Sequence, residues 1–230
     1  MTFPLPSTPI LDTFNRPDQD PINLSGNWIT PTPNAGVNVQ VISNEAATTN
    51  SAGGSEVYWR RRFGPDCEVY VTCTVKPDNG NWFFLNLRID NNDPPSAFVS
   101  AYFMVCTASA GTDVIQIWRQ DNPGALLASV NLEFNSGDRF LFRAEGSTFT
   151  GYRDSGSGFV QIIQAVDATY NNAGWMSMQL KNSVVRLDDF GGGDLGTLPV
   201  YQRIYGWHID IDDNGLEVPR IDTSPQGFSA

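Results

Sequence analysis

The sequence predicts an all-β fold, an antiparallel β-sandwich (jelly roll) with an N-terminal arm and a C-terminal β-hairpin extension. The first observation is the alternation of apolar and polar residues in short runs, as in Asp138–Glu145, where Phe140, Phe142 and Ala144 share one face. The second is the abundance of turn residues, with 21 Gly and 15 Pro. The third is that no apolar stripe with helical spacing extends beyond about two turns.

Each expected strand is an alternating or apolar run that ends at turn residues such as Gly, Pro, Asp and Asn. Runs spaced by roughly 8–12 residues are typical of a sandwich or barrel. A chain of 230 residues is long enough to form one such domain. In chain order the expected strands are Ile10–Asn15, Asn27–Ile29, Val37–Ser43, Glu45–Thr49, Glu56–Phe63, Cys67–Val75, Trp82–Asp90, Ala97–Cys106, Asp113–Gln120, Ala125–Glu133, Asp138–Glu145, Thr148–Asp154, Phe159–Val166, Gly174–Leu180 and Ser183–Phe190.

The central strands predict a face that is rich in aromatic and amide side chains. We take Val69, Leu85, Phe103 and Ile117 as facing the core. Sugars are held by aromatic rings together with paired hydrogen-bond donors and acceptors, so the opposite face is a candidate glycan- or partner-binding surface. The alternative is that loops or the C-terminal hairpin cover it. The face consists of Tyr70, Trp82, Asn86, Arg88, Tyr102, Gln116 and Trp118.

The three cysteines are expected to be free thiols in the core. Cys67 and Cys73 lie at even spacing on the apolar face of one strand, where six residues span about 20 Å, too far for a disulfide. Cys106 ends another strand. Buried free thiols are typical of a reducing compartment, and no Cys/His spacing indicates zinc.

The net charge of −11 and a pI near 4.3 disfavour nucleic-acid binding, because an acidic surface repels phosphates. The basic run Arg60–Arg62 lies in an expected strand, where local carboxylates can pair with it. The first ten residues, MTFPLPSTPI, do not have the pattern of a secretory signal, and no run approaches the roughly 18 apolar residues of a membrane span. We therefore expect a protein that is synthesised in the cytoplasm, has no signal peptide and does not enter a membrane.

Several segments resemble a known family. LDTFNRPDQDPINLSGNW is similar to the opening motif of concanavalin A-like, laminin-G-like domains, and GDRFLFRAEGSTFTGYRD, DATYNNAGWMSMQL and VVRLDDFGGG are similar to their closing strands. The resemblance implies a lectin- or glucanase-like jelly roll over residues 10–193, of a kind that also occurs in tailed-phage virion proteins. Residues 1–9 are then an arm and residues 194–230 a C-terminal extension.

The C-terminal extension is expected to form a hairpin that docks on its own domain or on a partner. Its turn, Asp212-Asp213-Asn214-Gly215, is a good hairpin signal, and an isolated hairpin is marginal in water. The residues expected to dock are Tyr201, Tyr205, Trp207 and His208. Asp210, Asp212 and Asn214 copy the first half of a calcium loop, but Ile221 stands where such a loop needs Glu. The alternatives are a structural calcium site and a plain acidic turn.

No catalytic pattern is evident. The resemblance implies that a glucanase of this fold would carry a Glu-x-Asp-x-x-Glu strand, which the sequence lacks. Asp188 and Asp189 are adjacent and point to opposite faces, and His208 is the single histidine. Gly191–Gly193 follows a strand without opening a helix, so we read it as a linker. We expect no enzyme and no cofactor other than a possible structural calcium.

The resemblance, the missing signal sequence and the two terminal extensions lead to the functional expectation. It is a non-enzymatic structural protein of a bacteriophage virion, either a capsid decoration (cement) protein or a tail-associated protein, in oligomer or lattice contact with other virion proteins. The alternative is a carbohydrate-binding module that attaches to a host surface glycan. A polysaccharide-active enzyme is a third possibility.

Overall fold

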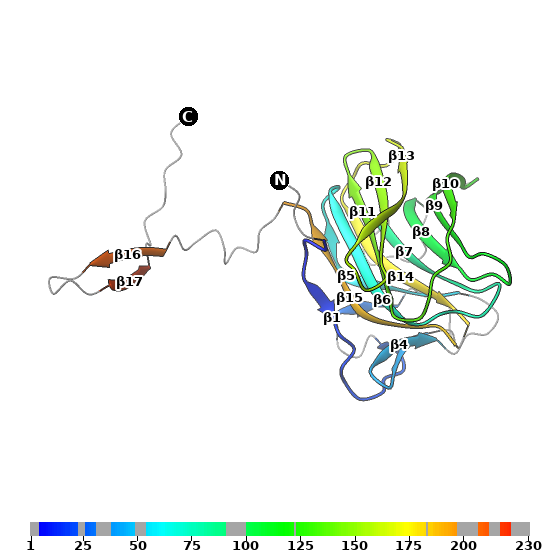
Figure 1. Ribbon diagram of the computed structural model, residues 1–230, viewed down its shortest axis with the longest axis horizontal. Coiled ribbons are helices and arrows are strands. Elements are labelled where there is room, and N and C mark those ends of the chain that lie inside the picture. Colours follow the sequence, from blue (N-terminus) through cyan, green and yellow to red (C-terminus); the bar gives the residue numbers. More distant parts are fainter. Residues whose placement is uncertain are drawn as a thin grey trace. The chain divides into compact units, whose positions relative to one another are not determined.

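The computed structural model describes residues 5–22, 26–30, 38–48, 54–90, 100–121, 123–182 and 184–196, together with the backbone of two short strands nearer the C-terminus (Figure 1). The chain divides into two compact units, Met1–Leu195 and Gly196–Ala230, and each is described by itself. All regular elements of the described residues are strands. None of them is a helix that could cross a membrane.

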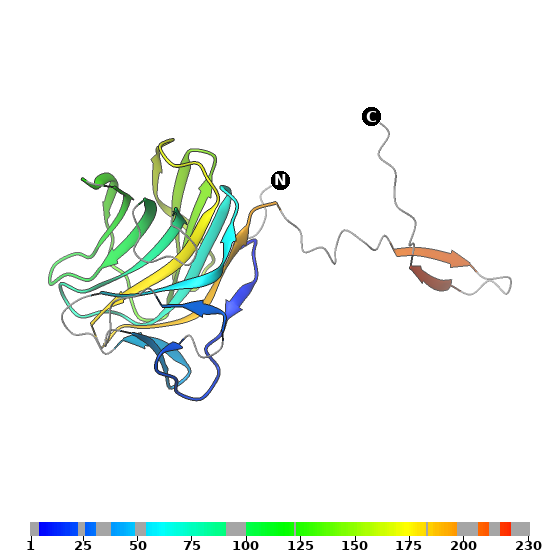
Figure 2. The ribbon, with the colours of Figure 1, turned by 180° about the vertical axis from the view of Figure 1, so that it is seen from behind.

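The first unit consists of two antiparallel sheets, which Figure 1 and Figure 2 show from opposite sides. Sheet A has the order β13 (Val160–Val166), β12 (Thr148–Asp154), β11 (Asp138–Glu145), β6 (Cys67–Val75), β15 (Arg186–Asp194), β4 (Glu45–Thr48), β3 (Val39–Ile42), with β1 (Ile10–Asp12) also paired to β15. Sheet B has the order β10 (Ala125–Asn131), β9 (Val114–Gln120), β8 (Ala101–Thr107), β7 (Trp82–Ile89), β14 (Gly174–Lys181), β5 (Gly54–Phe63), β2 (Trp28–Ile29). The predicted all-β sandwich is confirmed.

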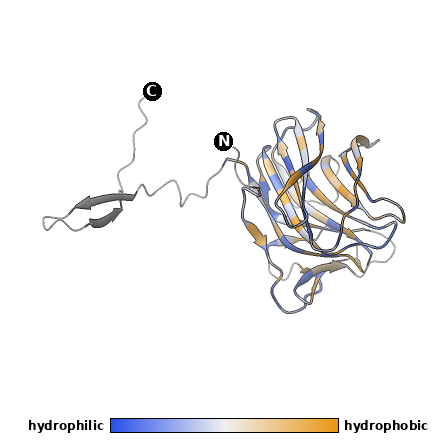
Figure 3. Ribbon diagram, viewed as in Figure 1, coloured by the Kyte–Doolittle hydropathy of each residue, from blue (hydrophilic) through white to orange (hydrophobic). Residues whose placement is uncertain are grey.

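The main core lies between the two sheets. Alternate residues of each strand enter it, so hydrophobic and hydrophilic positions alternate along the ribbons (Figure 3). Val69 of sheet A and Leu85 of sheet B are both fully buried there. The three cysteines are free and buried, as predicted. Burial raises the pKa of Cys67 and of Cys73 to about 12, so both stay protonated, and therefore unreactive, at neutral pH.

Around Glu68 and Tyr70, the outer face of sheet A is covered by the chain's own N-terminal residues. The backbone N–H of Ser7 donates to Glu68 Oε1 at 2.6 Å, and the Thr8 hydroxyl donates to the same oxygen at 2.9 Å. Arg143 Nε donates to the other oxygen of this carboxylate at 2.9 Å. Tyr70 Oη donates to the Thr8 carbonyl at 3.0 Å. Glu68 is thus fully buried and ion-paired on the far side of the sheet from the core.

The last strand of sheet A differs from the prediction. It begins at Arg186, not Ser183, and runs through the three glycines to Asp194, so Gly191–Gly193 is not a linker. A Cβ on Gly191 would lie 2.0 Å from Cζ of Tyr70, so the glycine allows the tyrosine ring to lie directly on the strand. Sequence spacing did not reveal this need, because it arises from the neighbouring strand β6.

The second unit contains the predicted hairpin, in which β16 (Trp207–Ile211) pairs antiparallel with β17 (Glu217–Ile221). The side chains expected to dock, those of Tyr201, Tyr205, Trp207 and His208, lie outside the described residues. The same holds for the possible calcium ligands Asp210, Asp212 and Asn214. Docking by the hairpin and calcium binding in its turn therefore stay predictions.

Candidate functional site

The outer face of sheet B, on the side away from sheet A, brings polar and aromatic side chains together from five neighbouring strands. Antiparallel register aligns them: Asn86 of β7 lies opposite Ser177 of β14 and Phe103 of β8, and Gln179 lies opposite Glu56 of β5. Residues directly opposite each other share a face, so these side chains are neighbours. This face contains four of the seven residues predicted for it, Trp82, Asn86, Gln116 and Trp118.

The polar centre of the face is a hydrogen-bonded group of Glu56, Tyr58, Asn86 and Ser177, which we name the Glu56 cluster. Ser177 Oγ donates to Glu56 Oε1 at 2.7 Å, and Tyr58 Oη donates to Oε2 at 2.9 Å. Asn86 Nδ2 donates to Ser177 Oγ at 2.7 Å and lies 3.5 Å from Glu56 Oε1. The serine hydroxyl therefore links the carboxyl group to the amide.

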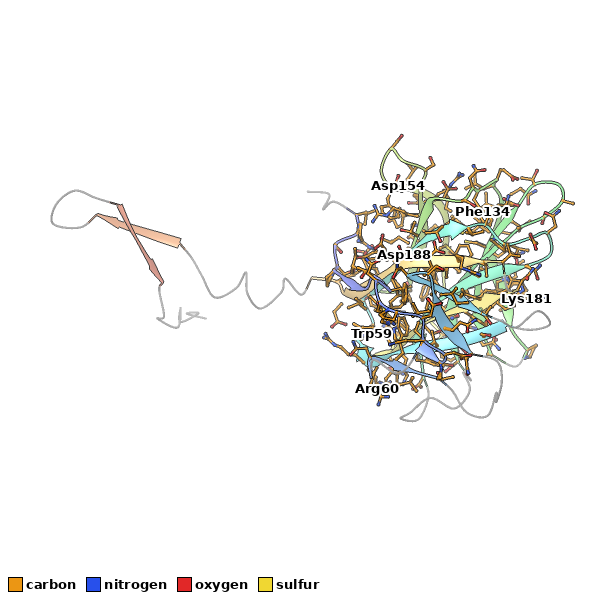
Figure 4. All side chains as sticks on the ribbon, turned by 90° about the horizontal axis from the view of Figure 1, so that it is seen from below. Trp59, Arg60, Phe134, Asp154, Lys181 and Asp188 are labelled. Carbon is orange, nitrogen blue, oxygen red and sulfur yellow. The ribbon has the colours of Figure 1, made fainter. Side chains whose placement is uncertain are left out.

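The carboxyl of Glu56 is difficult to ionise. Burial raises its pKa from 4.5 to about 7, although the hydrogen bonds from Ser177 and Tyr58 act in the opposite direction. All three neighbours in the cluster are uncharged side chains. Lys181, which is labelled in Figure 4, lies at the end of β14 on the same face. Its ammonium sits 5.8 Å from the centre of the Trp82 ring. At neutral pH the neutral and ionised forms of Glu56 are present in similar amounts.

Two buried polar atoms of this face lack a hydrogen-bond partner among the described residues. One is Oδ1 of Asn86, an acceptor, and the other is Nε1 of Trp175, a donor. Asn86 is fully buried and Trp175 is 4% exposed. Leaving a buried polar atom unpaired costs about 1–3 kcal/mol, and such atoms are rare in folded proteins. The hydrogen-bonding capacity of this face is therefore not used up by the protein itself.

Four aromatic rings form a row beside the Glu56 cluster, which we call the aromatic row. Trp82 stacks on Phe84 with centroids 4.1 Å apart, Phe84 on Phe103 at 4.7 Å, and Phe103 on Trp118 at 6.3 Å. Since the rings stack on one another, they offer mainly edges, not open faces, to a ligand. Gly54 allows the close approach of Trp82, whose Cη2 would lie 2.6 Å from a Cβ there.

Tyr70 and Tyr102 do not belong to this face, contrary to the prediction. Tyr70 lies on the outer face of sheet A, under Thr8. Tyr102 faces the core and stacks on Phe149 with centroids 3.8 Å apart, while Phe103, predicted to face the core, joins the aromatic row. Tyr102 can be buried because its hydroxyl donates to Asp167 Oδ1 at 2.6 Å and accepts from the Tyr170 N–H.

Arg88 is also misplaced by the prediction. It has φ 52° at an irregularity in the pairing of β7 with β14, which turns its side chain into the sandwich. There its guanidinium donates to the carbonyl oxygens of Pro65 at 2.6 Å, Gly146 at 2.7 Å and Tyr170 at 3.0 Å. The residue therefore ties three loops together at one end of the sandwich and is not available for a ligand on the outer face.

The most unusual group of the site, Glu56, was not among the predicted site residues. It alternates with the buried residues Ser55 and Val57 in β5, and Tyr58 follows on the same face. This alternation places Glu56 and Tyr58 on one face and is a signal in the sequence, but a single carboxylate in a strand does not match the paired acids that hydrolysis needs. Gln116, which was predicted, accepts a hydrogen bond from Trp118 Nε1 at 3.0 Å and so helps to orient the end of the aromatic row.

The Glu56 cluster offers hydrogen-bonding groups from uncharged side chains around a single carboxyl group. Glycoside hydrolysis generally needs two carboxyl groups, and the contacts of Glu56 within the described residues include no second one. The described part of the chain also holds no group of three His, Cys, Asp or Glu side chains placed to bind a metal. The absence of enzymatic activity and of a calcium site stay predictions.

No family model and no curated protein matches the sequence. Solved structures do match the fold. The carbohydrate-binding module CBM66 from Bacillus subtilis matches with TM-score 0.56 and 17% identity, covering 73% of this chain and 96% of its own. The exoplasmic/lumenal domain of VIP36 bound to Ca²⁺ and Man3GlcNAc matches with TM-score 0.58 and 12% identity, covering 88% and 95%. A legume lectin-like domain from Entamoeba histolytica matches with TM-score 0.53 and 10% identity, covering 76% and 92%.

These likenesses show a lectin-like jelly-roll fold, as the resemblance to concanavalin A-like domains implied. At such low identity they show the fold alone. The expected role in a bacteriophage virion and the expected contacts with virion proteins have no support in them and stay predictions.

Proposed function

We propose that this protein is a carbohydrate-binding module and that it holds a glycan on the outer face of sheet B. The observation that carries the proposal is the Glu56 cluster with its unpartnered neighbours, Asn86 Oδ1 and Trp175 Nε1. A sugar hydroxyl both donates and accepts hydrogen bonds, so it suits the partly exposed carboxyl group of Glu56 at the centre of this face. The fold likeness adds support, because CBM66 is by name a carbohydrate-binding module and VIP36 has been solved with mannose-containing glycans.

The aromatic row supplies the apolar part of the site. Its ring edges and the outer face of Trp118 lie beside amide groups, including that of Gln116. Sugar rings have apolar C–H surfaces and polar rims, and this mixture of aromatic and amide groups matches both. Because the rings cover one another, hydrogen bonds from the Glu56 cluster contribute more to recognition than flat stacking does.

The test is binding to a panel of immobilised oligosaccharides derived from mannan, glucan, galactan, fructan, xylan and polygalacturonate. Ser177→Ala removes the hydroxyl that joins Glu56 to Asn86, and a lost hydrogen bond of this kind weakens binding by about two- to tenfold. Ser147→Ala, in the turn between β11 and β12, is the matched control and keeps wild-type affinity. If wild-type protein retains no member of the panel, or if both variants bind equally well, glycan binding on this face is wrong.

A virion structural role is the other function expected from the sequence. No described residue favours it over glycan binding, and the two are compatible, since a virion protein can carry a glycan-binding domain. Co-sedimentation of the chain with phage particles would support that role, and a freely soluble monomer that binds only glycans would argue against it.

A further inference from the structure

We propose that Glu56 acts in the site as a neutral carboxylic acid that donates a hydrogen bond to the ligand, so that the site takes an uncharged sugar and rejects acidic ones. The inference rests on the proposed function of this face and adds a ligand class to it. It also makes Glu56 the residue that determines specificity.

Among the described residues, no cation lies beside the carboxyl group of Glu56. On β5 itself, Tyr58 touches the carboxyl, and the guanidinium groups of Arg60 and Arg62 reach the carbonyl oxygens of Trp28 and Ala173. On β14 the charged residue of this face is Lys181, whose ammonium lies at the Trp82 ring. The remaining ionisable groups of the neighbouring strands point inward: Arg88 on β7, and Tyr102 and Cys106 on β8.

The neutral and ionised forms of the Glu56 carboxyl group differ in the hydrogen bonds that they can make. An ionised carboxylate only accepts hydrogen bonds, and both of its oxygens already accept, one from Ser177 and one from Tyr58. The neutral acid keeps these contacts and adds one O–H donor. A sugar hydroxyl can accept from this donor. The neutral form can therefore donate a hydrogen bond to the ligand, which the ionised form cannot do.

The charge around Glu56 disfavours an acidic ligand. The chain has a net charge of −11, and the described outer face of sheet B pairs no cation with Glu56. A uronic or sialic acid residue would bring a charged carboxylate into a partly buried site that offers it no positive partner, which is unfavourable whether Glu56 is neutral or ionised. A neutral sugar carries no such penalty. Burial raises the pKa of Glu56 to about 7, so most of the Glu56 side chains are neutral at mildly acidic pH.

The experiment measures the affinity of wild-type protein, Glu56→Gln and Glu145→Gln at pH 6, 7 and 8. The probes are the neutral oligosaccharide that the wild type retains best and oligogalacturonate. With one titrating group near pH 7, wild-type affinity for the neutral sugar falls about tenfold from pH 6 to pH 8. Glu56→Gln keeps a donor and loses this pH dependence. Glu145→Gln, which removes the same charge from an exposed site on β11, behaves like the wild type.

Three outcomes overturn the inference alone: a flat wild-type profile, the same slope in Glu56→Gln, or equal affinity for oligogalacturonate. A ¹³C NMR titration of the Glu56 carboxyl in the free protein adds a readout that needs no ligand. A midpoint near pH 7 supports the neutral acid, and one below pH 5 overturns it while leaving glycan binding intact. Failure of the wild type to bind any sugar overturns the proposed function as well, so the two failures are distinguishable.

Discussion

Replacing Glu56 by Gln should change how the stability of the fold depends on pH. The pKa of Glu56 is raised from 4.5 to about 7 in the folded protein, chiefly by burial. Between these values the unfolded chain releases the proton while the folded chain holds it. The stability that goes with the bound proton is therefore fully present below about pH 4.5 and is lost as the pH rises to about 7. Gln cannot release a proton, so the variant should not lose stability in this window.

The size of this stability difference follows from the shift in the pKa of Glu56 on folding. One unit of pKa corresponds to about 1.4 kcal/mol, so the full difference is at most ~3 kcal/mol, and partial exposure of the side chain makes this an upper bound. For a domain of this size, 1 kcal/mol changes the melting temperature by about 2–4 °C. As the pH rises from 4.5 to 8, the melting temperature of Glu56→Gln relative to that of the wild type should therefore increase by up to about 10 °C.

Thermal unfolding followed by circular dichroism from pH 4 to pH 8.5 measures this difference directly. Many groups titrate in this range, but they are common to both proteins and cancel when the two profiles are subtracted. Glu145→Gln serves as the control for removing one negative charge. Parallel profiles for wild type and Glu56→Gln would refute the reasoning, because they would show that Glu56 titrates alike in the folded and unfolded chains.

Two further predictions concern the frame that holds the site. Arg88→Met should lower the free energy of unfolding of the first unit by about 3 kcal/mol or more in urea, because three carbonyl oxygens lose their donors. Arg88→Lys keeps the charge but not the planar guanidinium, so it should restore only part of this stability. Full restoration by lysine would contradict the assigned geometry. Gly191→Ala should lower the free energy of unfolding by about 1–3 kcal/mol, because its Cβ would collide with Tyr70. In the control Gly124→Ala the nearest atom to the new Cβ lies at 3.5 Å, so this variant should be nearly as stable as the wild type. Equal effects of the two substitutions in the same unfolding assay would rule the collision out.

The sequence predicts best those strands that have one polar and one apolar face. β11 and β12 begin and end where they were expected, because alternation along them is clear and short turns limit them. β8 is apolar on both faces, AYFMVC, and nearly all of it is buried, so periodicity could not decide which residues face the core. The inversion of Tyr102 and Phe103 follows from this ambiguity. The irregularity at Arg88 arises from the pairing of β14 with both β5 and β7. The sequence around Arg88 alone therefore does not predict it.

The candidate site was predictable in its aromatic and amide residues but not in its centre. Trp82, Asn86, Gln116 and Trp118 point outward in strands with readable alternation. The properties of Glu56 depend on Ser177, which is 121 residues away in the chain, and on the burial that the assembled sheet provides. No local pattern contains that information, since a glutamate in an alternating strand is ordinarily an exposed, ionised residue.

Two glutamates, the fully buried Glu68 and the partly exposed Glu56, lie on opposite outer faces and show why a ligand is expected on sheet B and not on sheet A. Glu68 on sheet A is ion-paired to Arg143 and accepts further hydrogen bonds from Ser7 and Thr8, so the chain itself satisfies the carboxylate and covers it. Glu56 on sheet B has uncharged donors only and lies beside the unpartnered oxygen of Asn86. Burying polar atoms without full pairing is costly, and natural folds keep such groups mainly where they serve a function. The carboxyl group that the protein leaves without a positive partner, that of Glu56, is therefore the one of the two that an outside molecule can complete.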